Sequence, residues 1–287
     1  MENINKIAIC CLSGGYKNAF TQGVLTAFEE SGLKADVYTA CSSSALISAF
    51  AAFGEIKQLD LTLWENGYAI SQEDGGDQSR AMLHSIQELA PVIKRKLWEP
   101  SASRLVIATS RITTSDAITI AQSEGAKRLG QKLLLNALRH NPEWKDQNLQ
   151  LELFDTRADE KGLLLTRENF HEVAYATTRM LHAWKIPAYI ENCAYIDGSY
   201  SSHFPVDFLA ELKCERIICI GAEKDKVFTN IFMQEEIPCQ IGGTSIDIIK
   251  PDVDLKDIGL DYYTITNDGL NSGFEHGYHI GLQYMKK

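Results

Sequence analysis

Apolar and polar positions follow two different patterns along the chain. Six runs of strand length lie at 7–12, 36–41, 104–110, 149–154, 193–197 and 216–222. Several of them are apolar throughout, which is typical of strands buried on both faces of a sheet. Between these runs the apolar residues recur at helical spacing, which predicts helices over 19–30, 43–53, 80–97 and 121–140. The alternation of strands and helices favours an α/β fold with a mainly parallel sheet.

Length and composition point to a globular protein with a large core. The chain has 287 residues, of which 45% are hydrophobic and 23% are charged, and these values argue against disorder. Neither an internal repeat nor a convincing linker interrupts it, so we expect a single domain over residues 1–287. The polar stretch 71–79, with its two adjacent glycines, is expected to be a mobile surface loop.

Charge limits the choice of partners. The formal net charge of −10 disfavours nucleic acid, because phosphate binding is driven largely by a positive surface. It also argues against strong electrostatic binding to anionic lipid, so we expect peripheral membrane contact at most. The apolar run at the N-terminus is too short for a signal peptide or a membrane span, and a cytoplasmic location is the expectation.

The cysteines and acidic residues do not indicate a cofactor or a metal. The seven cysteines are interpreted as reduced, buried thiols, and they are Cys10, Cys11, Cys41, Cys193, Cys214, Cys219 and Cys239. No CxxC, HxH or HExxH spacing occurs. The aspartates at 252, 254 and 257 lack the glycine and the glutamate of an EF-hand loop, so we interpret them as a solvated loop.

Two turns between a predicted strand and a predicted helix carry groups suited to acyl transfer. The first turn contains Gly14 and Gly15, fits neither nucleotide-binding spacing, and offers N–H groups that favour negative charge. The second presents Ser42 among small residues. A hydroxyl nucleophile with backbone donors beside it is the minimum equipment for attack on a carbonyl group. The alternative is that Ser42 and the serines after it only cap the next helix.

A third segment, 194–211, places Asp197 at the end of an apolar strand and directly before a glycine. Together the three segments resemble the patatin-like phospholipases, whose pattern is a GGGx[R/K]G loop, then GxSxG, then a distant DG[G/A]. The resemblance covers nearly the whole chain. It implies a three-layer fold with helices on both faces of the sheet, and a serine hydrolase that cleaves acyl esters of lipids, of the phospholipase or lysophospholipase type, without a cofactor.

The same resemblance assigns roles to individual residues. It makes Ser42 the nucleophile, Asp197 its base in a dyad without histidine, Gly14 and Gly15 the oxyanion hole, and Lys17 a substrate-binding residue. An ordinary aspartate is a weak base near neutral pH. The dyad therefore requires a site that raises the pKa of Asp197, or a very short contact with the serine.

The chain departs from the family pattern at Ser13, Asn18, Ala40, Ser44 and Ser199. We expect Asn18 to be the mildest change, because asparagine tolerates a positive φ. Ser44 adds a Cβ and a hydroxyl beside the elbow, so we expect it to tighten the pocket or to misplace Ser42. These departures leave a second possibility open, a catalytically weak or inactive patatin-like protein that binds lipid or a partner protein through the retained pocket.

Other nucleophiles and bases compete with this assignment. The order Ser42, Asp197, His276 is that of an α/β-hydrolase triad, but that fold places its oxyanion loop after a third strand, whereas here the glycine turn follows the first. His203 follows Asp197 closely and is interpreted as a structural residue at a helix entry. Cys41 precedes the elbow position and is interpreted as a buried thiol of the strand.

Overall fold

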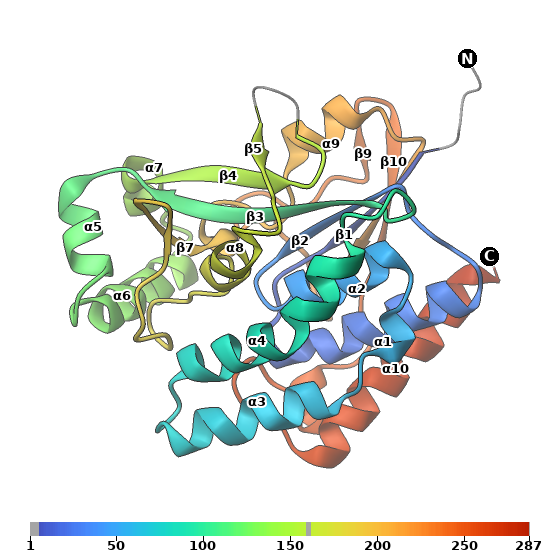
Figure 1. Ribbon diagram of the computed structural model, residues 1–287, viewed down its shortest axis with the longest axis horizontal. Coiled ribbons are helices and arrows are strands. Elements are labelled where there is room, and N and C mark those ends of the chain that lie inside the picture. Colours follow the sequence, from blue (N-terminus) through green and yellow to red (C-terminus); the bar gives the residue numbers. More distant parts are fainter. Residues whose placement is uncertain (1–5, 159–161, 287) are drawn as a thin grey trace.

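The computed structural model describes residues 6–158 and 162–286. Its strands are β1 (Ile7–Cys11), β2 (Val37–Cys41), β3 (Arg104–Ile112), β4 (Leu149–Asp155), β5 (Leu163–Leu164), β6 (Tyr189–Ile190), β7 (Cys193–Asp197), β8 (Arg216–Ile220), β9 (Gln240–Ile241) and β10 (Thr244–Ile249). In space they follow the order β5, β4, β3, β2, β1, β8, β10, β9, while β7 pairs with β3 and β6 (Figure 1). The pairs β1–β2, β2–β3, β1–β8 and β8–β10 are parallel. The predicted mainly parallel α/β sheet is confirmed.

The helices are α1 (Asn18–Glu30), α2 (Ser44–Phe53), α3 (Thr62–Glu73), α4 (Gln78–Lys96), α5 (Ser115–Ala121), α6 (Ala126–Leu138), α7 (Glu143–Asn148), α8 (Phe170–Ala176), α9 (Val206–Leu212) and α10 (Asn267–Met285). Three predicted helices correspond closely to α1, α2 and α4. The fourth, predicted over 121–140, is wrong in extent, because a turn separates α5 from α6. In this turn Ser123 Oγ accepts a hydrogen bond from the Gly125 N–H at 3.2 Å. Helix α3 was not predicted. Within the described ranges, no helix is long and apolar enough to cross a membrane.

Two layers of side chains bury the sheet. On one face α1, α2, α4, α8 and α10 contribute the largest core cluster, which includes Phe20 and Phe170. On the other face α9 and the segments around it contribute a second cluster, which includes Phe204. Cys10 belongs to the second cluster and Cys11 to the first, because successive residues of a strand point to opposite faces.

The cysteine prediction holds for five of the seven residues. Cys10, Cys11, Cys41, Cys214 and Cys219 are buried free thiols, but Cys193 is partly buried and Cys239 is exposed. Cys239 lies just before the edge strand β9, where one side of the chain faces solvent. The prediction of burial is therefore wrong for this residue.

The expected mobile loop over 71–79 is largely structured. Helix α3 extends to Glu73 and α4 begins at Gln78, so only a short turn separates them. Asp77 and Ser79 are buried, at 8% and 0% exposure. The polar residues that suggested solvent in the sequence are used for hydrogen bonds inside the protein instead.

Strand pairing brings two chain segments head to head. Cys41 at the end of β2 pairs with Ala108 of β3, and Asp197 at the end of β7 pairs with the next residue of β3, Thr109. Strand β2 is parallel to β3 and β7 is antiparallel to it. The carboxyl ends of β2 and β7 therefore point at each other along the same edge of β3, and Ser42 directly follows one of them.

Candidate active site

Ser42 stands on a sharp turn between β2 and α2. Its φ is 61°, in the left-handed region, which costs a residue with a side chain about 1–3 kcal/mol unless the surroundings enforce it. The enforcing contact is Thr177, whose Oγ1 accepts the Ser42 N–H at 2.9 Å and donates to the Ala108 carbonyl at 2.6 Å. A strained serine in this position is what a nucleophile elbow requires.

Asp197 lies opposite Ser42 and is completely buried. Its Oδ1 accepts the Ser199 N–H at 2.8 Å, whereas Oδ2 has no hydrogen-bond partner among the described residues. Burial raises the pKa of Asp197 to about 6, and the neighbouring Ser42 and Ser199 oppose that rise. Ser42 is thus close enough to affect the carboxyl group, although no hydrogen bond of ordinary geometry joins their side chains within the described residues.

Gly198 allows the two strand ends to come this close. A Cβ at this position would lie 2.2 Å from the Ala108 carbonyl oxygen and 2.9 Å from Cys41 Sγ. Cys41 Sγ in turn lies 3.8 Å from Asp197 Oδ1. Burial raises the pKa of Cys41 well above its ordinary value, so the group remains a thiol. This agrees with its interpretation as a buried strand residue.

The glycine loop after β1 presents unused backbone donors. The N–H groups of Gly14 and Gly15 donate no hydrogen bond to any described residue, and both glycines line the same cavity as Ser42. Gly15 has a φ of 54°, and a Cβ there would lie 2.3 Å from the carbonyl oxygen of Tyr262. The N–H of Ser43, which follows Ser42, is likewise without an acceptor within the described ranges.

Ser13 stands at a position where the family pattern has glycine, and its side chain makes a hydrogen bond. Its Oγ lies 2.7 Å from His203 Nδ1, and His203 Nε2 lies 2.6 Å from the Phe228 carbonyl oxygen. A carbonyl only accepts, so Nε2 carries the proton and the Ser13 hydroxyl donates to Nδ1. Burial lowers the pKa of His203 to about 4, which keeps the ring neutral. With both nitrogens occupied, His203 acts as a structural residue, as predicted.

Asn18 replaces the last glycine of the loop for a reason different from the one expected. Its φ is −69°, so this position does not need a residue that tolerates positive φ. Instead the side-chain amide donates to the Leu12 carbonyl at 3.2 Å and to Ser43 Oγ at 2.9 Å. Asn18 therefore ties the glycine loop to the elbow.

Ser44 does not crowd the cavity, and the expectation that it would is wrong. Its side chain is fully buried and does not line the cavity. Its Oγ lies 2.8 Å from the carbonyl oxygens of both Cys11 and Cys41 and accepts the Cys41 N–H at 3.0 Å. The hydroxyl thus satisfies backbone groups where β1 and β2 end.

Lys17 lies outside the cavity lining. Its Nζ is 2.9 Å from Glu223 Oε1 and 4.6 Å from the centre of the Tyr262 ring, and the residue is 4% exposed. These contacts hold the glycine loop against the segments after β8 and before α10. Of the five residues predicted for the site, the structure brings Ser42, Asp197, Gly14 and Gly15 together in one cavity lining, and Lys17 is not part of that lining.

Ser42 stands between two cavities. The larger, of about 450 Å³, is lined by both Ser42 and Asp197 and reaches Glu223 and Lys226. The smaller, of about 70 Å³, is lined mainly by apolar side chains of α2, α3 and α4. The two share Gly15, Ser42, Trp184 and Tyr262. If the carbonyl carbon of an ester lay at Ser42, its acyl chain and its alcohol part could therefore lie in different cavities.

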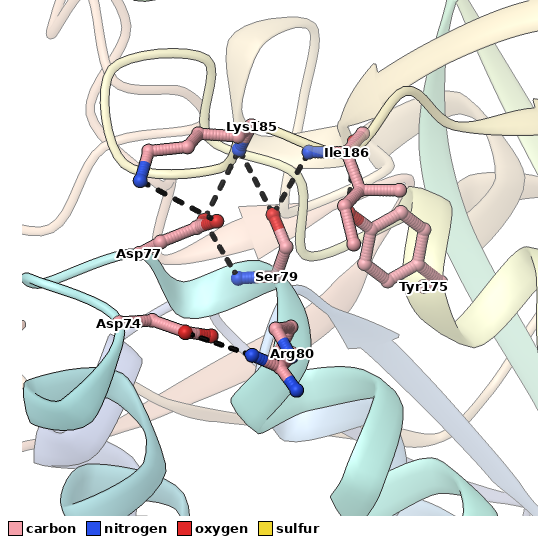
Figure 2. Close-up of polar contacts among 7 residues, drawn as sticks. All are labelled: Asp74, Asp77, Ser79, Arg80, Tyr175, Lys185 and Ile186. Atoms are coloured by element: carbon pink, nitrogen blue, oxygen red, sulfur yellow. Dashed lines mark hydrogen bonds and ion pairs between the residues drawn. The ribbon is translucent and has the colours of Figure 1, made fainter.

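A polar cluster fixes the segment that forms part of both cavity walls. Figure 2 shows Asp77 and Ser79, at the start of α4, facing the backbone of Lys185 and Ile186. The Lys185 N–H donates to Asp77 Oδ1 at 3.1 Å and to Ser79 Oγ at 2.9 Å, and the Ile186 N–H donates to Ser79 Oγ at 3.0 Å. Trp184, which lines both cavities, immediately precedes these residues.

The α/β-hydrolase triad is excluded by the position of His276. This residue lies on α10, with its Nε2 3.0 Å from Asp252 Oδ1 and its ring against Phe20. It does not line the cavity that holds Ser42 and Asp197. His276 therefore cannot complete a triad with Ser42 and Asp197.

Two residues of the site were missed in the sequence. Ser43 had a usable signal, because in elbow sites the N–H after the nucleophile often serves as an oxyanion donor. Thr177 had none, because it lies far from Ser42 in the chain and its contact arises only when the segment after α8 crosses the end of β2.

The profile of the patatin-like phospholipase family matches residues 9–210. The match covers well over half of the chain, from β1 to α9, and includes both strand ends that meet at the cavity. This protein belongs to the patatin-like phospholipase family. At the level of the family, membership supports lipid acyl hydrolysis with a lipid ester as the substrate. No curated protein matches the sequence.

Proposed function

We propose that this protein is a serine hydrolase of lipid acyl esters, of the phospholipase or lysophospholipase type, acting through one domain over residues 1–287. The observation that carries the proposal is the placement of Ser42, in a strained left-handed turn, beside a fully buried Asp197 in one cavity with unused backbone donors. A strained serine, a base and oxyanion donors are the parts that acyl transfer needs.

In the first half of the reaction, Asp197 accepts the proton of the Ser42 hydroxyl as Oγ attacks the ester carbonyl. Burial raises the pKa of Asp197 to about 6, which makes it a stronger base than an exposed aspartate while leaving it mostly ionised at neutral pH. The proton then passes to the leaving alcohol. In the second half, Asp197 takes a proton from water as the water attacks the acyl-enzyme. It returns that proton to Ser42 Oγ as the bond between Oγ and the acyl carbon breaks and the carboxylic acid leaves.

The negative oxygen of the tetrahedral intermediate needs donors that are free before the reaction. The N–H groups of Gly14, Gly15 and Ser43 fit this role, because none of them has an acceptor among the described residues. The start of α2, just after Ser42, adds the favourable end of a helix dipole. Removing one such donor in other hydrolases costs about 10²–10³ in rate.

The two cavities suggest how an ester would lie. The smaller one is almost entirely apolar, and residues such as Leu46, Leu63 and Met82 suit the start of an acyl chain. The larger one carries polar groups of Asn230, Glu223 and Lys226 and suits the alcohol part. The scissile carbonyl would then sit at Ser42, where the two cavities meet.

A second candidate is a patatin-like protein that binds lipid or a partner without hydrolysing it. One observation favours it: Asp197 Oδ2 is buried without a partner, and no hydrogen bond of ordinary geometry joins Ser42 to Asp197 within the described residues. In a working dyad, the hydrogen bond between Ser42 and Asp197 must form when substrate is bound. Catalytic hydrogen bonds are often long in a free enzyme and shorten only in the complex with substrate.

Labelling with a fluorophosphonate probe separates the two candidates, because the probe reacts with an activated serine whatever the substrate. We expect one adduct on the parent protein, mapped to Ser42 by mass spectrometry, and none on Ser42→Ala. Ser123→Ala, at an exposed serine between α5 and α6, is the matched control and should label like the parent. A folded parent that takes no label would leave the binding protein as the better candidate.

A further inference from the structure

Helix α6 presents a mixed basic and apolar face to solvent. Leu129, Leu133 and Ala137 are buried on its inner side. The outer side carries exposed residues of two kinds, the cations Lys127, Arg128, Lys132 and Arg139, the last at the helix end, and the leucines Leu135 and Leu138. Leu135 is 54% exposed and Leu138 is 70% exposed, more than any other large apolar residue among the described ones. We call these six residues the α6 face.

The cations of the α6 face lack acidic partners. No ion pair within the described residues involves any of the four. The sequence from 126 to 142 contains no aspartate or glutamate, although the whole chain has a net charge of −10. The α6 face is therefore a locally basic surface on a protein whose net charge is negative.

The α6 face is continuous with the larger cavity. Leu134, Ala137 and Leu138 of α6 line that cavity together with Ser42 and Asp197. Leu138 both faces solvent and lines the cavity, so the cavity wall and the exposed face meet at this residue. In Figure 1, α6 lies at the end of the molecule away from both termini.

We propose that the α6 face docks the protein on an anionic lipid surface. Exposed leucines flanked by cations on one side of a helix are the pattern of a helix that lies in a membrane interface, with the apolar side chains among the acyl chains and the cations at the phosphates. A nucleic acid would match the cations but would leave the two leucines uncovered. The proposal extends the proposed function, because docking here brings lipid esters to the cavity wall.

Vesicle flotation tests the proposal without depending on catalysis, because every protein in it carries Ser42→Ala. Vesicles of phosphatidylcholine alone are compared with vesicles of phosphatidylcholine and phosphatidylglycerol in equal parts. We expect binding to the mixed vesicles only, weakening as salt is added. In Arg128→Gln/Lys132→Gln the partition coefficient should fall about 25-fold, since each cation near an anionic surface contributes about fivefold.

Matched controls separate the α6 face from general charge. Arg95→Gln/Lys213→Gln removes the same charge from exposed cations on other elements and should leave binding unchanged. Leu135→Ser should weaken binding while keeping the salt dependence, because it removes apolar burial and no charge. Thermal unfolding confirms that each variant is folded, as expected for exposed sites.

Three results would overturn the proposal: no binding to the mixed vesicles, equal binding by parent and Arg128→Gln/Lys132→Gln, or binding to a DNA oligonucleotide in place of vesicles. None of these depends on hydrolysis. Conversely, if the parent protein takes no fluorophosphonate label and its Ser42→Ala variant still binds vesicles, the docking proposal stands and the hydrolase proposal is rejected. Failure of one proposal is thus distinguishable from failure of the other.

Discussion

The hydroxyl of Ser44 lies 2.8 Å from the carbonyl oxygen of Cys11, and this contact joins the end of β1 to the turn after β2. The family pattern has glycine at this position, so a pocket narrowed by the extra atoms was expected. Instead, the Ser44 hydroxyl makes side-chain hydrogen bonds with backbone groups of Cys11 and Cys41 at the ends of the two strands. The same is true of Asn18 and Ser13, which are hydrogen-bonded to the elbow and to His203.

Ser44→Gly should therefore destabilise the protein and should not raise turnover. The change removes a buried hydroxyl that serves three backbone groups, which costs about 1–3 kcal/mol. Ser48→Ala is the matched control, because Ser48 is buried in the same helix and its hydroxyl has no partner among the described residues. Chemical denaturation measures both. A rise in turnover for Ser44→Gly would restore the crowding hypothesis.

Asp197→Asn should abolish hydrolysis and yet stabilise the fold at neutral pH. The folded protein holds the Asp197 proton more tightly, with a pKa of about 6 against an ordinary 3.8, so its stability falls as pH rises through that window. Asparagine keeps the acceptor for the Ser199 N–H and removes the buried charge. Its advantage should reach at most about 3 kcal/mol above pH 6 and vanish below pH 3.8. Denaturation at several pH values measures this, and equal stability throughout would contradict it.

The pH dependence of activity should report the same group. If Asp197 is the base, kcat/KM on a soluble aryl ester rises with pH through about 6 and then levels off, because only the ionised carboxyl accepts the Ser42 proton. His203 should not contribute a second rise, since its ring is neutral across this range. A His203→Gln variant with the same profile would support that assignment, and an inflection that disappears with it would contradict it.

Gly67 should control the length of the acyl chain that the site accepts. It faces the smaller cavity from α3, and a Cβ there would stand 3.8 Å from Ser85 Oγ and Tyr16 Oη, which is ordinary contact. Gly67→Leu should fill the cavity and lower kcat/KM for octanoyl relative to acetyl esters about tenfold or more. Gly67→Ala is the control, which should stabilise the helix by up to about 1 kcal/mol with a smaller effect on selectivity. An unchanged ratio for Gly67→Leu would place the acyl chain elsewhere.

The polar cluster of Figure 2 should be needed for activity although it touches no substrate. Asp77→Ala removes the acceptor for the Ser79 and Lys185 N–H groups, which should cost about 1–3 kcal/mol of stability and loosen the segment that carries Trp184. Arg80→Ala breaks only the exposed pair with Asp74 and should cost less than about 1 kcal/mol. Equal losses in the two variants would show that the cluster does not position the cavity wall.

Much of the fold was readable because buried parallel strands and amphipathic helices leave strong patterns. The six predicted strands correspond to β1, β2, β3, β4, β7 and β8, and the sheet is mainly parallel as expected. Strand β10 was missed because only two of its residues, Ile246 and Ile249, are buried near one edge of the sheet. Helix α3 was missed because it buries few of its residues, so its apolar pattern is weak.

The sequence by itself determined which chemical groups are present and where strands end, because strand patterns and small-residue turns are local. It placed Ser42 and Asp197 at strand ends and gave Gly14 and Gly15 a turn. Only the tertiary structure decided that these ends face each other along β3 and that the carboxyl group is buried. It also showed that Ser44 contacts the ends of β1 and β2 and that Lys17 pairs with Glu223. Those facts depend on strand order and on contacts between distant residues, which no local pattern encodes.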